Sequence, residues 1–359
     1  MKREVFKFDI LTWMFAAGAN PQAKDGAEIR PSEIRGQLRW WFRALGGFKA
    51  DARPVKEQEE FYFGGVGGSP MHSRIIVRVR QSALLQQELK DADALGARLN
   101  TPLGYLLFPL RSNEKNEVDA SRAYFIPNDS SSFAFSLEIC LRDAEAEWED
   151  VKALVAVFGH LGALGFRSRR CMGAVAFHDS GPMNLKDALG HFKASENIVI
   201  KALPRSGSME ACVNALANWL KNWRSYGSTR MGLNESGDGF MYAKNDHDAG
   251  LGNAEKVYRA AIGLPMIQQY SSGERLKNEW TPKDGARFAS PVILRPYRIS
   301  EGRWLPLVVF ADADAHRWCK GRSVVIKGKG GKSQSLPLSM DLYEAMKADT
   351  KLQPPSFDA

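Results

Sequence analysis

Three arginines recur at every fourth position of one segment, residues 33–47, which reads EIRGQLRWWFRALGG. At about 100° per residue in a helix, such a spacing places them in one stripe beside a stripe of apolar side chains. The arginine stripe consists of Arg35, Arg39 and Arg43. The apolar stripe consists of Ile34, Leu38, Trp41 and Leu45. A row of guanidinium groups can follow the phosphates of a nucleic acid, and Trp40, which projects away from the apolar stripe, is available to stack on a base.

The same helix also has a purely structural interpretation. Its arginines can pair with acidic neighbours at the surface, and Trp40 can lie under a loop. We expect Trp41 in the core because it shares the apolar stripe, and either indole needs a partner for its N–H group if it is buried. Gly36 lies beyond the arginine stripe and would let another backbone approach closely. Composition alone leaves RNA contact and the structural role both open.

A second segment, residues 158–177, combines glycine with arginine and reads FGHLGALGFRSRRCMGAVAF. Its glycines are Gly159, Gly162, Gly165 and Gly173, and its arginines are Arg167, Arg169 and Arg170. A dinucleotide fingerprint requires strand, glycine loop and helix in that order, whereas here a predicted helix comes first and a predicted strand last. We therefore expect a loop that lets another backbone lie close and offers forked donors to phosphate. The alternative is a tight turn whose arginines pair with acids or face a neighbouring subunit.

Lys329–Ser333 reads KGGKS and ends like a phosphate-binding loop of nucleotide hydrolases. Ile326 stands where that motif requires its first glycine, and no helix is predicted to follow. We expect instead a basic hairpin tip whose Lys329 and Lys332 contact RNA.

Acidic and histidine side chains form no convincing catalytic or metal-binding group. Asp312, Asp314 and His316 alternate after a predicted strand, which favours a solvated strand end over a metal site. His72 and His160 lie near glycine-rich segments and could serve as the acid and base of a metal-free RNA nuclease. Nothing in the sequence brings them together, so we expect no catalytic residue, no metal and no cofactor.

The chain has 359 residues, 44% of them hydrophobic, which suits two compact domains. Its net charge of +8 and its pI of about 9.2 favour a polyanionic partner. No apolar run approaches the roughly 20 residues that span a bilayer, and the charged start lacks a signal-peptide core. Four cysteines lie far apart, as free thiols of a reducing compartment do. We therefore expect a cytoplasmic protein without a membrane partner.

The order of predicted elements in the first half is strand, helix, strand, strand, helix, strand. The strands are expected within residues 4–16, 74–80, 133–141 and 174–177, and the helices within 32–47 and 145–158. This order matches an α+β, ferredoxin-like or RRM-like unit, whose open sheet face commonly binds RNA. In the second half we expect an interdomain passage at 178–207, a helix at 209–224 and a long polar loop at 225–253. A hairpin of strands 291–299 and 304–310 and a strand at 324–326 follow.

Two of these segments resemble motifs of RAMP superfamily proteins, specifically the first subunit of type III-B CRISPR Cmr effector complexes. Residues 28–46, EIRPSEIRGQLRWWFRALG, resemble the family's basic helix, and residues 161–170, LGALGFRSRR, resemble its glycine-rich loop. Cys171 stands where the family pattern has glycine. Weaker similarities lie in EFYFG at 60–64, YRAAIGLP at 258–265 and RFASP at 287–291.

The resemblance implies tandem ferredoxin-like or RRM-like domains, at residues 1–180 and 181–359, with the second one degenerate. It implies a non-catalytic subunit that holds the 3′ part of the guide RNA, helps to capture single-stranded target RNA, and contacts other Cmr subunits. The residues expected to contact RNA are Arg30, Arg35, Arg39, Trp40, Arg43, Arg167, Arg169, Arg170, Lys329 and Lys332. Two other functions remain open. One is an endoribonuclease of the same superfamily, which would process guide RNA or cut target RNA, and the other is a general nucleic-acid chaperone.

Overall fold

The computed structural model describes most of the chain and leaves out short connecting segments. The described residues are 1–16, 26–65, 71–90, 95, 101–110, 122–128, 131–143, 147–225, 238–269, 277–285, 287–328 and 333–357.

The first unit is a four-stranded antiparallel sheet in the order β2-β5-β1-β6. Its strands are β1 (Lys2–Ile10), β2 (Ile75–Gln81), β5 (Phe135–Leu141) and β6 (Val175–Phe177). The helices α1 (Pro31–Ala44) and α4 (Trp148–Leu161) connect β1 to β2 and β5 to β6. This connectivity and strand order are those of the ferredoxin-like fold, as the sequence predicted.

One face of this sheet is buried under the two helices. Phe6, Phe8 and Ile10 of β1 join the apolar stripe of α1 in one core. Val5 and Lys7 between them are exposed on the other side of the sheet, whereas Asp9 is buried there by His178 and Arg298. α1 places Leu38 and Trp41 in this core, and each is about 1% exposed. The predicted helical stripe and the expected burial of Trp41 are therefore confirmed.

Further elements extend the first unit. α2 (Val55–Phe63) follows α1, and the hairpin of β3 (Gln87–Lys90) and β4 (Arg122–Phe125) encloses α3 (Pro102–Leu106). α5 (Leu185–Gly190) packs on α4, so part of the predicted interdomain passage belongs to the first core. The same passage also contains a strand, β7 (Ile198–Ala202), which the sequence did not reveal.

The second unit repeats the architecture incompletely. Its sheet has the order β10-β11-β7, with β10 (Val292–Ser300) and β11 (Arg303–Ala311), and α6 (Met209–Arg224) connects β7 to this part of the chain. This is the ferredoxin-like order without its last strand. α9 (Asp341–Lys347) takes the place of the second helix, and its Tyr343 joins α6 and the sheet in one core. A short bridge between Ala202 and Gln353 marks where the fourth strand would pair. The second unit is thus a degenerate ferredoxin-like unit.

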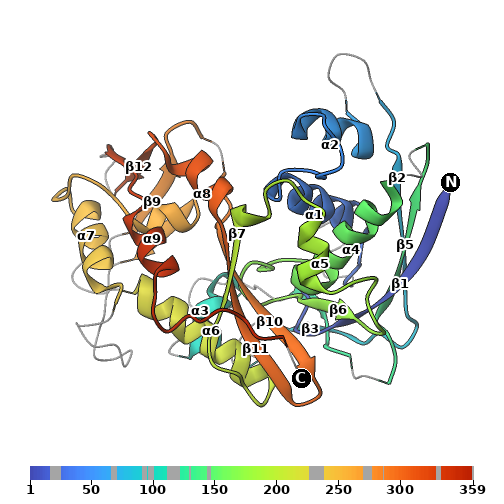
Figure 1. Cartoon of the computed structure of the whole chain (residues 1–359). Helices are drawn as coiled ribbons and strands as arrows, with labels where there is room; N and C mark the ends of the chain where they lie inside the picture. The colour runs from blue at the N-terminus through green and yellow to red at the C-terminus, as the bar shows by residue number, and fades with distance from the viewer. Residues whose placement is uncertain are drawn as a thin grey trace.

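The two units stack in four layers (Figure 1). The first sheet lies outermost, followed by α1, α4 and α5, then the second sheet, and finally α6 and α9 on the far side. Alternate residues of the second sheet divide between these neighbours: Leu307 and Val309 join the first core, whereas Val308 and Phe310 join the second. The second sheet is therefore covered on both faces, while the first keeps one face open.

A third sheet, in the order β13-β12-β9-β8, completes the second half. Its strands are β8 (Met266–Gln269), β9 (Lys277–Pro282), β12 (Ser323–Lys327) and β13 (Ser333–Pro337). The predicted hairpins at 291–310 and around the KGGKS segment are confirmed by the pairings β10–β11 and β12–β13.

Two predictions for this half are wrong. Residues 240–250 of the expected polar loop form α7 (Phe240–Gly250), because Ala243 and Ala249 pack inside and the buried Asp246 carboxylate accepts hydrogen bonds from the backbone N–H groups of Tyr258 and Arg259. The expected strand end at 312–316 is instead α8 (Asp312–Cys319).

Candidate nucleic-acid interface

The open face of the first sheet is basic. The strand register places Val5 opposite Glu138 and Glu138 opposite Arg78, so the outward positions of three strands form one surface. The cationic side chains at these positions are Arg3, Lys7, Arg78 and Arg80. Glu138 pairs with Arg3 and Arg78, and Asp179 lies 3.7 Å from Lys7, but the surplus stays positive. The Arg78 side chain is 62% exposed. Charges this exposed can exchange partners with phosphate at little cost, because surface ion pairs contribute little free energy.

This open face lacks the stacking residues of an RNA-recognition sheet. The two central strands present Val5, Ser136 and Glu138 outward, whereas RRM domains present aromatic side chains there. The nearby Phe133 lies under Lys7 at 5.5 Å. The face can therefore hold phosphates but offers little means of reading bases.

The arginine stripe of α1 is held by α2. Arg39 and Arg43 both donate to the same oxygen of Glu59, at 2.7 and 2.6 Å, and Arg35 donates to the carbonyl of Phe63. In this structure the arginines of the stripe therefore pair with an acidic neighbour and a carbonyl, as the structural interpretation expects. Arg43 nevertheless stays exposed, and Glu59 alone balances Arg39 and Arg43.

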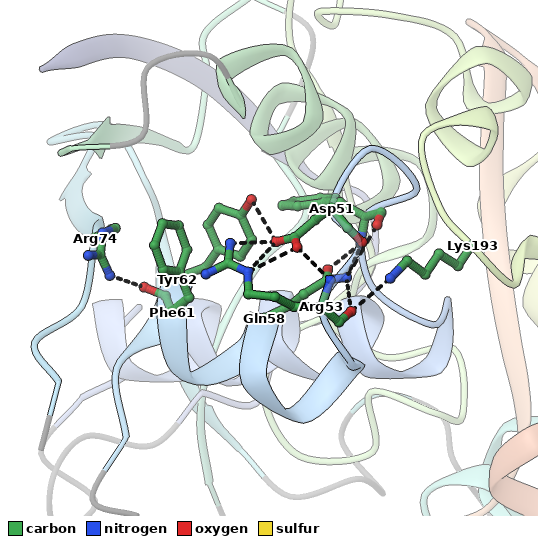
Figure 2. A network of polar contacts seen from close by, with 8 residues as sticks. Asp51, Arg53, Gln58, Phe61, Tyr62, Arg74 and Lys193 are labelled. Carbon is green, nitrogen blue, oxygen red and sulfur yellow. Dashed lines mark hydrogen bonds and ion pairs between the residues drawn. The ribbon is translucent and has the colours of Figure 1, made fainter. Parts of the chain in front are cut away.

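A polar network fixes α2 beneath these arginines (Figure 2). Gln58, which is fully buried, donates to the carbonyls of Asp51 and Arg53, and the Arg53 guanidinium forms a bidentate pair with the Asp51 carboxylate. The Phe61 ring lies between two guanidinium groups, with that of Arg53 3.6 Å and that of Arg74 3.8 Å from its centroid. α2 is therefore a rigid partner for α1.

Trp40 is not the free stacking platform that the sequence suggested. Its ring lies 4.6 Å from that of Trp41 and 4.5 Å from the Arg169 guanidinium, and its Nε1–H donates to Asp314 at 2.9 Å. The reason is tertiary: α8 of the second unit reaches the side of α1 that periodicity alone leaves open.

The glycines of the second segment are required by the chain's own packing. A Cβ on Gly173, whose φ is +63°, would lie 1.8 Å from the carbonyl oxygen of Leu164, and one on Gly159 would lie 2.1 Å from the Phe177 ring. Gly162 and Gly165 would likewise collide with the carbonyls of Phe158 and Phe15. The backbone expected to lie close to this loop is therefore the protein's own.

Cys171 adopts the backbone conformation for which the family pattern has a glycine. Its φ is +73°, in the left-handed region that glycine adopts most readily. The residue is buried, and its carbonyl accepts a hydrogen bond of 2.7 Å from the Thr12 hydroxyl. Burial raises the pKa of its thiol, so it is not a reactive nucleophile at neutral pH.

The three arginines of the loop point into the contact between the two units rather than to solvent. Arg170 is buried and donates to the carbonyls of Val292 and Ile262, and Arg169 donates to the carbonyl of Ser290. Arg167 donates to the carbonyl of Leu106 at 2.6 Å. In this structure, carbonyls from distant segments occupy donors of all three arginines, and their expected contact with RNA stays a prediction.

At this contact, the segments 258–265 and 287–291, which resemble the family, lie next to the glycine-rich loop. Leu264 and Phe288 exchange backbone hydrogen bonds of 2.8 and 2.9 Å, which joins the segments 258–265 and 287–291. The carbonyls of Ile262 and Ser290, one from each segment, are those that receive Arg170 and Arg169.

Two residues of this region escaped the sequence analysis. Glu33, in the first turn of α1, accepts a hydrogen bond from the N–H of Gly165, and burial raises the pKa of its carboxyl. Phe166 is 50% exposed beside it, held by a bridge to Phe15. Its place between glycine and arginine was the available signal for an exposed aromatic side chain that could stack on a base.

The remaining predicted residues divide into two groups. Arg30 precedes α1 and is half-buried, and its Nε–H group has no hydrogen-bond partner. Lys329 and Lys332 lie outside the described residues. Among the described residues, no group of three or more His, Cys, Asp or Glu side chains could hold a metal ion. The imidazole of His160 lies between Tyr297 and Met183, and His72 is exposed.

All four cysteines are free, as predicted, and all four are buried. Within the described ranges, no helix is long and apolar enough to cross a membrane.

Comparison with known proteins bears on the first unit above all. Residues 8–176 match the family model of the RAMP superfamily. The chain is 28% identical over 191 residues to CRISPR system Cmr subunit Cmr1-2 of Pyrococcus furiosus, covering 49% of this chain and 95% of that protein. It is 32% identical over 155 residues to subunit Cmr1-1 of the same organism, covering 41% of this chain and 40% of that protein.

A solved structure extends the likeness to both units. The crystal structure of Cmr1 from Pyrococcus furiosus in its apo form superposes with a TM-score of 0.50 at 17% sequence identity. The superposition covers 86% of this chain and 88% of that one, so the likeness in fold includes the degenerate second unit.

Proposed function

The chain carries a RAMP superfamily domain, and from that premise we propose that it is a non-catalytic, RNA-binding subunit of a type III-B CRISPR Cmr effector complex. In this role it holds the 3′ part of the guide RNA and helps to capture single-stranded target RNA. The observation that carries the proposal is the open, basic face of the first sheet in a chain similar to Cmr1 subunits.

Charge and shape support RNA as the partner. The cations of the open face lie on β1 and β2, which flank β5 and are therefore about 10 Å apart; this spread suits an extended strand of phosphates better than one small anion. The face lacks outward aromatic residues on its central strands, so we expect binding with little sequence preference. A guide-holding subunit must accept different sequences, which fits this chemistry.

The arrangement of histidines supports a non-catalytic role. A metal-free RNA nuclease needs an acid and a base within reach of one phosphate. The His160 imidazole is engaged by Tyr297 of β10 and by Met183, and His72 lies before β2. The alternative function, an endoribonuclease of the same superfamily, would require an acid and a base other than these two histidines.

Binding and cleavage can be tested in one preparation. The full chain is titrated with a fluorescently labelled single-stranded RNA while anisotropy is recorded between 50 and 300 mM salt, about the range in which phosphate contacts respond strongly. We expect log K to fall linearly with log salt, by about 0.7 for each phosphate neutralised. The same RNA, incubated with and without magnesium and run on a denaturing gel, should stay intact.

Matched variants locate the contact. Lys7→Glu combined with Arg80→Glu reverses two charges on the open face, whereas Arg303→Glu reverses one at the exposed β10–β11 turn. The double variant should lose most RNA affinity and the control should keep it. A flat salt dependence, or equal loss in both proteins, argues against the proposal. Specific cleavage products would favour the nuclease alternative.

Co-purification separates an effector subunit from a general nucleic-acid chaperone. The tagged chain is purified from cells that express the neighbouring Cmr subunits and a guide RNA. A stable complex containing one defined guide is expected, whereas mixed RNA without partner subunits would indicate a chaperone.

A further inference from the structure

A groove opens at the edge of the first sheet, between the first turn of α1 and the edge strand β2. It has a volume of about 360 Å³, enough for one nucleotide. Figure 1 shows α1 and β2 side by side at the outer edge of the first unit. Its lining includes Ser32, Arg35, Ser73, Ile75, Val77 and Arg142. The sequence pattern did not reveal it, because β2 and Arg142 lie far from α1 along the chain.

The residues described as lining the groove include basic side chains and no acidic ones. Among the described residues that line it, Arg35 and Arg142 are the charged ones. Arg35 donates a hydrogen bond to the carbonyl of Phe63, and Arg142 donates one to the carbonyl of Ser73. In the described part of the chain neither guanidinium contacts a carboxylate, in contrast to Arg39 and Arg43, which share Glu59. The groove therefore has charge to offer an anion.

One donor of the lining is unused. The Nε–H group of Arg142 is buried without a hydrogen-bond partner. A buried donor that is left unpaired is costly, so a ligand group that accepts its hydrogen bond gains affinity. α1 adds a 14-residue helix whose first turn has no side-chain cap and whose dipole favours an anion.

The other wall is aliphatic. Ile75, Ile76 and Val77 of β2 line it beside the Ser73 hydroxyl. Burial also lowers the pKa of the Arg35 guanidinium, which shows that this charge lies partly out of water. A phosphate beside an apolar sugar or base face is the chemistry that such a pair of walls accommodates.

We propose that this groove binds one nucleotide of single-stranded RNA, with its phosphate on Arg35 and Arg142 and its sugar or base against the half-buried Ile76 and Val77. The proposal rests on the proposed function and adds a specific subsite to it. Arg3 on the open face lies opposite Cys140, which pairs with Ile76 of the groove, so an RNA strand on the face can pass around the edge strand β2 into the groove.

Ser32 permits a test that leaves the fold intact. Ser32→Glu places a carboxylate at the groove, yet an acidic residue in the first turn of a helix is neutral or stabilising. Ser32→Gln has similar size without the charge. We expect Ser32→Glu to weaken RNA binding about tenfold with an unchanged or higher melting temperature, and Ser32→Gln to weaken it clearly less, because it adds bulk without a negative charge.

Arg142→Gln provides the second arm. It should weaken binding several-fold and lower the salt slope by about 0.7, the effect of one lost phosphate contact on a single strand. Arg303→Gln is its control at an exposed site of the second unit. Uridine 5′-monophosphate serves as competitor: if it displaces RNA only from the wild type and not from Arg142→Gln, the groove recognises the nucleotide itself.

The outcomes separate this inference from the proposed function. If the wild type binds RNA and both Ser32→Glu and Arg142→Gln bind equally well, the groove is not a subsite and the proposed function stands. If the monophosphate binds the groove but RNA affinity is unchanged in both variants, the ligand is a free nucleotide and the RNA subsite is refuted. If the wild type does not bind RNA at all, both proposals fail.

Discussion

The indole nitrogen of Trp40 lies 2.9 Å from the carboxylate of Asp314, to which it donates a hydrogen bond across 274 positions of sequence. The other oxygen of Asp314 accepts from Arg317 at 2.8 Å, and the Arg169 guanidinium covers the indole ring. One side chain of the first unit is thereby tied to α8 of the second and to the glycine-rich loop. The contact explains why a tryptophan stands outside the apolar stripe of α1.

Trp40→Phe keeps a ring against Trp41 and Arg169 but removes the donor to Asp314. We expect the free energy of unfolding to fall by about 1–2 kcal/mol, because a partly buried carboxylate loses a partner. Trp41→Ala should cost more, about 3–5 kcal/mol, because it leaves a cavity in the core. Urea denaturation of both variants measures this. If Trp40→Phe keeps full stability but weakens RNA binding, Trp40 is a stacking residue after all.

Reversing the charges of Arg167, Arg169 and Arg170 should destabilise the protein itself. Each guanidinium donates to backbone carbonyls at the contact between the units, and a carboxylate there would face those same oxygens. A loss of about 3 kcal/mol or more is expected for Arg170→Glu alone, because a buried charge would have no partner. The measurement is urea unfolding, with Arg303→Glu as an exposed control. A stable Arg170→Glu protein that no longer binds RNA would restore the loop as the RNA site.

Stability should fall at acid pH through His160. Burial lowers the pKa of this imidazole below its ordinary value of 6.5. The neutral ring accepts from the Tyr297 hydroxyl through Nδ1 and donates to the Met183 carbonyl through Nε2, and the guanidinium of Arg295 disfavours a second charge nearby.

The sign of the effect follows from the lowered pKa. The unfolded chain binds the proton more tightly, so this contribution is complete above about pH 6.5 and is lost as the pH falls through the pKa of the folded state. Melting temperatures recorded from pH 8 to about 5 should drop less steeply for His160→Gln than for the wild type. Parallel curves for the two proteins would show that His160 is not responsible.

Gly36→Ala should stabilise the protein. An added Cβ at this position of α1 would meet no atom within 4 Å, so the expected close approach of another segment of the chain is wrong. Alanine has a higher helix propensity than glycine by about 1 kcal/mol. Gly173→Ala is the contrasting variant and should destabilise, because its Cβ would collide with Leu164. Thermal melts of both variants test the assignment, and a loss of stability in Gly36→Ala would contradict it.

The first unit was largely predictable because its elements carry strong local signals. Phe6, Phe8 and Ile10 alternate as a half-buried strand does, and Ile34, Leu38 and Trp41 recur at helical spacing. The elements of the second unit were less predictable from the sequence. α7 has few apolar residues, and its buried Asp246 looks like a loop residue until the N–H groups of Tyr258 and Arg259 are seen to cover it.

The sequence by itself determined the basic character of the protein, the ferredoxin-like order of its first unit and the positions of its arginines. Only the tertiary structure decided which arginines an anion can reach. Arg170 and Arg35 both lie in segments whose sequence suggests phosphate binding. Arg170 is enclosed by carbonyls of the second unit, whereas Arg35 lines an open groove. The physical reason is that a guanidinium's availability depends on which distant acceptors reach it, and those are set by packing rather than by local spacing.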